Sequence, residues 1–259
     1  MIAVQQERIF TSQCPLQGLV IVKDYLEADG NFLIPYTLKE ALSDGFKVML
    51  VCLANTVSNY QYMLRKLGTN LAACIESKQV AALEALSLDW LSDTLSAEDA
   101  MKHVQGKLAE AIRKLQSDAS AKLCIIFDSF SLLRELCRSE AQWRSFVHRC
   151  SSPGSFQQGA ACLVMRMHAD VDEAAQWQLY LEHSAQVVIQ VDALEAGQSL
   201  DITGQLVVKQ RSLPPGLDQS QSGHLTGGEA RMEHTRLLNY KLAENDVHLT
   251  SRPASTLRR

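Results

Sequence analysis

Residues 18–54 restrict the fold more than any other part of the sequence. Residues 19–22 and 48–53 are short continuous apolar runs, the pattern of strands that are buried on both faces of a parallel sheet. Between them, apolar residues recur at helical spacing over 32–42, and the stretch 43–45, Ser-Asp-Gly, is a helix stop signal. The segment therefore predicts a strand, a loop, a helix and a second strand, which together form a βαβ unit.

The loop after the first strand is where such units commonly hold a phosphate group. A phosphate loop has the pattern GxxxxGK[ST], in which backbone N–H groups and the lysine hold the phosphates and the hydroxyl residue holds magnesium. With Gly30 as the second glycine, other residues stand in place of the first glycine, the lysine and the hydroxyl residue: Tyr25, Asn31 and Phe32. Because Asp29-Gly30 is also a common turn pair, the stretch is either a degenerate phosphate loop or an ordinary turn.

Length and composition bound the rest of the prediction. The chain has 259 residues, of which 46% are hydrophobic, enough for a sizeable core. No repeat or linker is evident, so we predict one domain over 1–259, with a polar lead-in at 1–17, a flexible loop at about 213–230 and a basic tail at 251–259. The net charge of −4 argues against a free-standing nucleic-acid binder, but it leaves open a subunit whose basic loops act within an assembly.

The sequence gives no sign of a membrane span, a cofactor or a metal site. No run approaches about 18 apolar residues, and the N-terminus lacks the apolar core of a secretion signal. The seven cysteines include no CxxC pair, and most lie in apolar runs, which indicates reduced core thiols in a cytosolic or nuclear protein. The histidines lack the spacing of metal ligands, and neither a GxSxG elbow nor a GxGxxG turn after a strand is present.

The remaining chain alternates helices and strands before a strand-rich end. This order predicts an α/β fold with a mostly parallel central sheet. The predicted helices cover residues 55–68, 96–116, about 130 through 146, and 174–181. The predicted strands cover 122–127, 160–165, 185–191, 204–208 and a closing hairpin over 237–249, with a possible short strand at 71–75.

Two residues at predicted strand ends are candidates for a site. Asp128 follows an apolar run, at the place where nucleotide-hydrolysing folds carry a carboxylate that orients magnesium. It is equally suited to cap a helix that starts near Phe130, and we keep both interpretations. His168 also ends a strand, although it lies in a charged stretch, 166–173, that we expect to be an exposed loop.

Taken together, three segments resemble the RecA-like accessory subunits of Elongator. These are DYLEADGNFL at 24–33, CLANTVSNYQYMLRKLG at 52–68 and IIFDSFSLL at 125–133. The Gly-x-Phe-Leu sequence that opens the first helix and the Lys-Leu-Gly that ends the next one are shared features, and the resemblance covers most of residues 18–250. It implies a three-layer RecA-like fold.

The resemblance also implies a function. The fourth, fifth and sixth Elongator subunits form a hetero-hexameric ring of two copies each, which joins the catalytic part of Elongator and binds transfer RNA. The complex modifies the wobble uridine of transfer RNA. The expected partners are therefore the sister subunits of the ring, the catalytic subcomplex and, through the ring, transfer RNA, and the expected location is the cytoplasm and the nucleus.

Active relatives of this fold use a Glu shortly after the second strand to activate water, whereas residues 54–56, Ala-Asn-Thr, offer no carboxylate. With Asn31 and Phe32 at the loop positions, only Asp128 remains of the catalytic set, which implies that the chain does not hydrolyse ATP unaided. One alternative is a divergent ATPase in which Lys23 reaches the phosphates. Another is an α/β metabolic enzyme that uses Asp128 and His168.

RNA contacts within a ring are made by basic and aromatic side chains on loops that face the pore. Four residues near the ends of predicted strands are candidates for this role: Arg166, His168, Lys209 and Arg211. Each is also compatible with an ordinary solvated surface position, and the sequence does not show which loops face inward.

Overall fold

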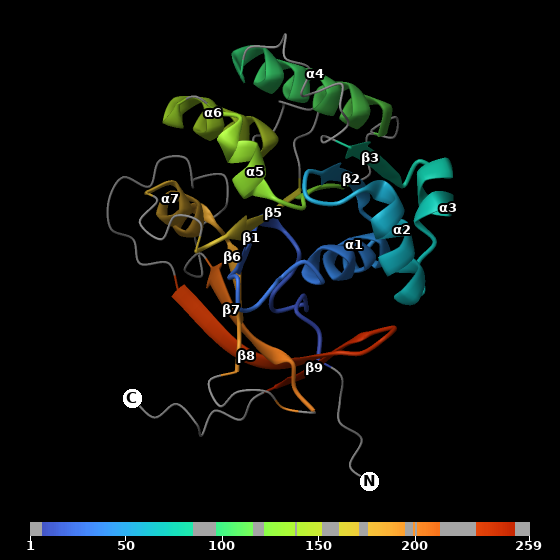
Figure 1. Ribbon diagram of the computed structural model, residues 1–259, viewed down its shortest axis with the longest axis vertical. Coiled ribbons are helices and arrows are strands. Elements are labelled where there is room, and N and C mark those ends of the chain that lie inside the picture. The colour runs from blue at the N-terminus through green and yellow to red at the C-terminus, as the bar shows by residue number, and fades with distance from the viewer. Residues whose placement is uncertain are drawn as a thin grey trace.

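The computed structural model is built around one nine-stranded sheet with helices on both faces (Figure 1). It describes residues 7–84, 97–115, 122–137, 139–151, 161–170, 176–194, 199, 201–212 and 232–251. The strands are β1 Gly18–Asp24, β2 Lys47–Cys52, β3 Val80–Glu84, β4 Leu123–Phe127, β5 Cys162–His168, β6 Val187–Asp192, β7 Gly204–Ser212, β8 Met232–Leu242 and β9 Val247–Ser251.

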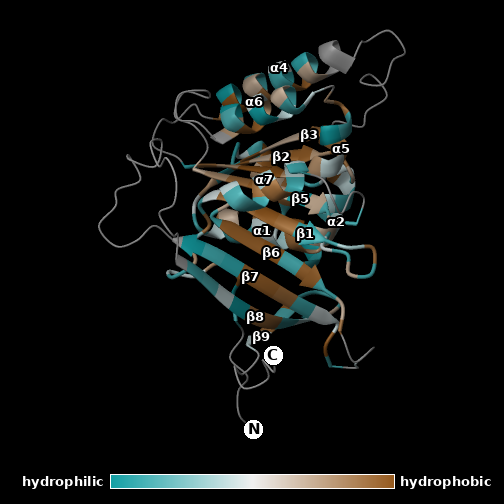
Figure 2. Cartoon of the chain, turned by 90° about the vertical axis from the view of Figure 1, so that its left-hand side faces the viewer, coloured by the Kyte–Doolittle hydropathy of each residue, from teal (hydrophilic) through white to brown (hydrophobic). Residues whose placement is uncertain are grey.

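Their order in the sheet is β3-β2-β4-β5-β1-β6-β7-β8-β9. The six strands from β3 to β6 pair in parallel, and β7, β8 and β9 continue the sheet in antiparallel pairing. The prediction of a mostly parallel sheet with a strand-rich C-terminal part is confirmed. Figure 2 shows that the central strands are coloured mainly as apolar, as continuous apolar runs require.

Seven helices are described: α1 Leu33–Ser43, α2 Val57–Lys66, α3 Leu71–Glu76, α4 Ala97–Leu115, α5 Phe130–Glu135, α6 Glu140–Ser151 and α7 Gln176–Ser184. Helices α1, α2 and α3 contribute to one hydrophobic core, and α4 to α7 contribute to a second. Successive strand residues alternate between the two, with Val20 in the first and Ile21 in the second. The sheet is thus the middle of three layers (Figure 1).

The strand predicted at 71–75 is wrong, since this segment forms α3. The Asn70 side chain accepts the Ala73 N–H at 3.3 Å and so caps the helix. Gly68, with φ of 80°, turns the chain out of α2 just before. The third parallel strand comes later, as β3.

The single helix predicted from about 130 through 146 is two helices, α5 and α6. The second starts anew, because the Ser139 hydroxyl accepts the Gln142 N–H at 3.3 Å in the manner of an N-cap. The charged stretch expected to be a loop at 166–173 begins inside a strand, because β5 extends to His168.

The N-terminal lead-in, which we predicted to be polar, is partly buried. Four of its side chains are buried in the core that α1 contributes to: Ile9, Phe10, Cys14 and Leu16. The predicted loop at 213–230 lies outside the described residues, as does the predicted tail except for Ser251, which ends β9. Among the helices described, none combines the length and the apolar character needed to cross a membrane.

Candidate functional site

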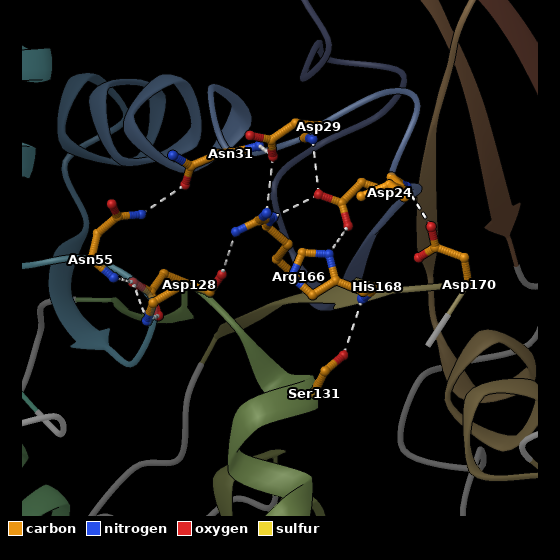
Figure 3. A network of polar contacts seen from close by, with 12 residues as sticks. Asp24, Asp29, Asn31, Asn55, Asp128, Ser131, Arg166, His168 and Asp170 are labelled. Carbon is orange, nitrogen blue, oxygen red and sulfur yellow. Dashed lines mark hydrogen bonds and ion pairs between the residues drawn. The ribbon is translucent and has the colours of Figure 1, made fainter. Parts of the chain in front are cut away.

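The strands β2, β4, β5 and β1 lie next to one another, and their carboxyl ends reach the same edge of the sheet. We call it the carboxyl edge. Ligands of open α/β sheets bind in the crevice at this edge, where the loops after the strands meet. Here residues at the ends of these strands and in the loops after them form one network of polar contacts (Figure 3).

The loop after β1 comes close to the end of its own strand. The Gly30 N–H donates to Asp24 Oδ2 at 2.8 Å. A Cβ at position 30 would lie 3.1 Å from Asp24 Cβ, so a residue without Cβ suits this approach. In a phosphate loop such an N–H faces the ligand, whereas here it is bonded to a carboxylate of the chain.

The other residues of the degenerate loop are also engaged within the fold. The Tyr25 and Ala28 backbones exchange two hydrogen bonds, which close a tight turn. The Asn31 Oδ1 accepts from Asn55 Nδ2 at 3.0 Å. The ring of Phe32 stacks on Tyr240, with centroids 4.7 Å apart. Tyr25, Asn31 and Phe32, the residues that replace the phosphate-loop pattern, therefore each contact other residues of the chain.

Arg166 lies at the centre of the network, buried in β5 (Figure 3). Its Nε donates to Asp24 Oδ2 at 2.8 Å, and its Nη2 donates to Asp29 Oδ1 at 2.9 Å. His168 Nδ1 lies 2.7 Å from the other oxygen of Asp24. The two side chains of the central pair are 6% and 1% exposed, so this charge pair is almost fully removed from water.

These contacts determine how the Asp24 carboxyl titrates. Burial alone would raise the pKa of Asp24, but the hydrogen bond with His168 and the charge of Arg166 hold that pKa below its ordinary value. The folded protein therefore binds this proton less readily than the unfolded chain does. The resulting stability is present above the ordinary carboxyl pKa of about 4 and is lost as the pH falls through the lowered value.

A pH series on the variant Asp24→Asn tests this. We expect the free energy of unfolding of the unsubstituted protein to fall more steeply than that of the variant between about pH 5 and about pH 2, because only the former must protonate Asp24. Urea unfolding at each pH measures it. Parallel curves for the two proteins would contradict the assignment.

Asp128 holds the loop after β2. Its carboxylate accepts the N–H groups of Leu53 at 2.6 Å, Ala54 at 3.0 Å and Asn55 at 3.0 Å, and the hydroxyl of Tyr60 at 3.1 Å. Burial raises the pKa of Asp128 against the opposing effect of these donors. Burial also raises the pKa of Tyr60, so its hydroxyl keeps the proton that it donates.

Of the two interpretations of Asp128, the helix cap is wrong, because Ser129 caps α5 by accepting the Leu132 N–H at 3.4 Å. Both oxygens of Asp128 are bonded to the chain itself. The described residues include no group of three or more His, Cys, Asp or Glu side chains that could hold a metal ion. The edge of the sheet thus presents N–H donors that are already occupied by two internal carboxylates, Asp24 and Asp128.

Lys23 is also committed to a partner within the fold. Its Nζ donates to Glu182 Oε1 of α7 at 2.7 Å. Burial alone would lower the pKa of Lys23, but this hydrogen bond and the charge of Glu182 bring it above the ordinary value. The side chain is therefore tied to α7.

The four RNA candidates are not brought together. Arg166 and His168 lie at the end of β5, at the carboxyl edge. Lys209 and Arg211 lie at the opposite edge of the sheet. The reason is that β7 runs antiparallel to β6, so that Lys209 pairs with Val188 near the start of β6. The Arg211 guanidinium bonds to Glu233 and to the Glu182 carbonyl. RNA contact by any of the four stays a prediction.

Sequence reasoning missed Asp24 and Tyr60. Asp24 is the last residue of β1, and the rule that singles out Asp128, a polar residue at the carboxyl end of a parallel strand, applies equally to it. Tyr60 carries no such signal, since its helical spacing predicts only a core residue and its hydroxyl partner lies 68 positions away.

The comparisons with known proteins agree on one family. The family model described as Elongation complex protein 6 matches residues 8–227. Elongator complex protein 6 of Xenopus laevis is 26% identical over 244 residues, covering 88% of each chain. The protein of the same name from Homo sapiens is 22% identical over 227 residues, covering 80% of this chain and 85% of the relative.

Two solved structures share the fold. An uncharacterized protein from Pyrococcus horikoshii, in complex with an unknown peptide, matches with a TM-score of 0.60 at 14% identity, covering 91% of this chain and 92% of that one. A KaiC-like protein from the same organism matches with a TM-score of 0.56 at 10% identity, covering 96% and 100%. These neighbours confirm the RecA-like fold class, and the match over residues 8–227 shows that this chain belongs to the Elongation complex protein 6 family.

Proposed function

We propose that this chain is a non-catalytic subunit of the Elongator accessory ring. One observation supports this most strongly: the backbone donors at the carboxyl edge, from Gly30 and from residues 53–55, are bonded to Asp24 and Asp128 rather than free for a phosphate. A RecA-like fold whose phosphate-binding donors are bonded within the chain is suited to bind neighbouring subunits rather than a nucleotide.

The proposed partners follow from the family. The chain would join the fourth and fifth Elongator subunits in a hetero-hexameric ring of two copies each, and the ring would associate with the catalytic subcomplex. Through the ring it would support the binding of transfer RNA and the modification of its wobble uridine. The proposed location is the cytoplasm and the nucleus.

The absence of ATP hydrolysis is part of the proposal. Removing one preorganised group that stabilises transition-state charge typically costs about 100- to 1000-fold in rate. Asn31 stands where the phosphate-binding lysine would be, and residues 54–56 offer no carboxylate. In the divergent-ATPase alternative Lys23 replaces that lysine, but its Nζ is bonded to Glu182, which favours the non-catalytic proposal.

Assembly with purified partners tests the proposal. We expect the chain to elute as a stable complex when it is mixed with the fourth and fifth subunits, because a ring subunit has two neighbours and therefore two interfaces. Size-exclusion chromatography coupled to light scattering measures the mass. A chain that elutes alone under conditions where the other two subunits are folded would contradict the ring assignment.

A further inference from the structure

Exposed apolar side chains occur on the turn and the helices that follow the strands of the carboxyl edge. Of the six large hydrophobic side chains that are exposed in the described part of the chain, four come from elements that follow β1, β4 and β5: Leu26 at 91% exposed, Leu132 at 43%, Leu179 at 59% and Tyr180 at 41%. We call these four side chains the edge patch. The other two, Tyr62 and Leu242, lie on α2 and at the end of β8.

One short segment, residues 168–170, connects the elements that carry the edge patch. The His168 N–H donates to Ser131 Oγ at 3.0 Å, next to Leu132. The His168 carbonyl accepts from Gln178 at 3.1 Å, next to Leu179. Asp170 accepts the N–H of Leu26 itself. Figure 3 shows Ser131 and Asp170 on either side of His168.

The patch is presented by ordered elements. Leu26 lies in the tight turn that the Tyr25 and Ala28 backbones close with two hydrogen bonds. Tyr180 lies in α7 with the Arg144 guanidinium 4.3 Å from its ring centre. An apolar side chain held in place before binding loses less conformational entropy when a partner covers it.

The charged groups beside the patch are mainly acidic. Within residues 25–29 and 168–170, the exposed charged side chains are Glu27, Asp29 and Asp170, and of these Asp29 is paired with Arg166. The basic groups nearby are paired as well, Arg144 with Glu140 and Lys23 with Glu182, so within these two stretches the exposed charges without a described ion pair are those of Glu27 and Asp170. A phosphate backbone is repelled by such a rim, whereas lysine or arginine side chains are attracted to it.

We propose that the edge patch is the docking surface for a neighbouring protein subunit that presents apolar side chains bordered by Lys or Arg. Exposed apolar side chains with a polar rim are typical of protein interfaces, in which a few central apolar residues carry most of the binding energy. The proposal rests on the proposed ring function. It adds that the edge patch, with its acidic rim, is the surface through which a neighbouring subunit binds.

The test compares the double variant Leu26→Asp/Leu179→Glu with the matched control Leu242→Glu, which also adds charge to an exposed leucine. We expect the double variant to weaken association with the fourth and fifth subunits by about tenfold or more, and the control to bind like the unsubstituted protein. Equal thermal unfolding midpoints check that all three proteins are folded. Association of the double variant at unchanged affinity would overturn the proposal.

The charge of the partner is tested with Glu27→Lys. We expect this variant to bind several-fold more weakly and to lose part of the salt dependence of association, since it removes one acidic group from the rim. If the assembled ring containing the double variant instead loses RNA affinity while its assembly is unchanged, the patch binds RNA and the proposal is overturned. If the unsubstituted chain fails to associate at all, the ring function itself fails.

Discussion

Replacing Arg166 by methionine is expected to lower the free energy of unfolding by about 3–5 kcal/mol. The substitution keeps much of the side-chain volume but leaves Asp24, at 1% exposed, without its guanidinium partner, and it removes the ion pair of Asp29. An uncompensated carboxylate in a buried site is among the most destabilising changes that a single substitution makes. Urea unfolding followed by circular dichroism at neutral pH measures the change.

Lys114→Met is the matched control. Lys114 forms an exposed pair with Glu110 within one helix, and such pairs contribute at most about 1 kcal/mol. The double variant Arg166→Met/Asp24→Asn should recover part of the loss, because it removes both charges of the buried pair. A loss below about 1 kcal/mol for Arg166→Met would contradict the role given to the ion network.

Replacing Asp128 by alanine is expected to cost about 3 kcal/mol or more, because two of its donors, the Leu53 N–H and the Tyr60 hydroxyl, are buried, and each buried donor left without an acceptor costs roughly 1–3 kcal/mol. The N–H groups of Leu53, Ala54 and Asn55 lose their common acceptor, and so does the Tyr60 hydroxyl. Urea unfolding measures the loss. Hydrogen exchange of the three amides should accelerate selectively, since the loop after β2 is no longer held.

Tyr60→Phe separates the contributions around Asp128. It removes a single neutral donor, so we expect a loss of about 1 kcal/mol with the three amides still protected. Asp128→Asn keeps one acceptor oxygen and should fall between the two. If alanine at position 128 changes neither stability nor amide exchange, the carboxylate does not organise this loop, and a role in binding a ligand becomes the better explanation.

The parallel core was predictable because its strands carry their signal locally. Continuous apolar runs such as 48–53 and 122–127 identify strands buried on both faces without any knowledge of their neighbours. The segment at 71–75 fails the same test, since a short apolar run fits a helix equally well and only the capping residue Asn70 distinguishes the two.

The site was predictable only in part, because its pairs join residues far apart in the chain. Arg166 has the sequence environment of a surface residue, yet its partner Asp24 lies 142 positions away and makes burial possible. The reversal of β7 is likewise not visible locally, so Lys209 and Arg166 could not be assigned to opposite edges. Asp128 was found, but its four donors depend on how the loop after β2 folds over it.

Titration of the purified chain with magnesium ATP, followed by isothermal calorimetry, tests the central claim most directly. A sheet edge whose donors already serve Asp24 and Asp128 should show no saturable binding up to millimolar nucleotide, both for the unsubstituted chain and for Lys23→Ala. Binding of one nucleotide per chain at micromolar affinity, lost in Lys23→Ala, would show that the edge remains a nucleotide site and would contradict the account.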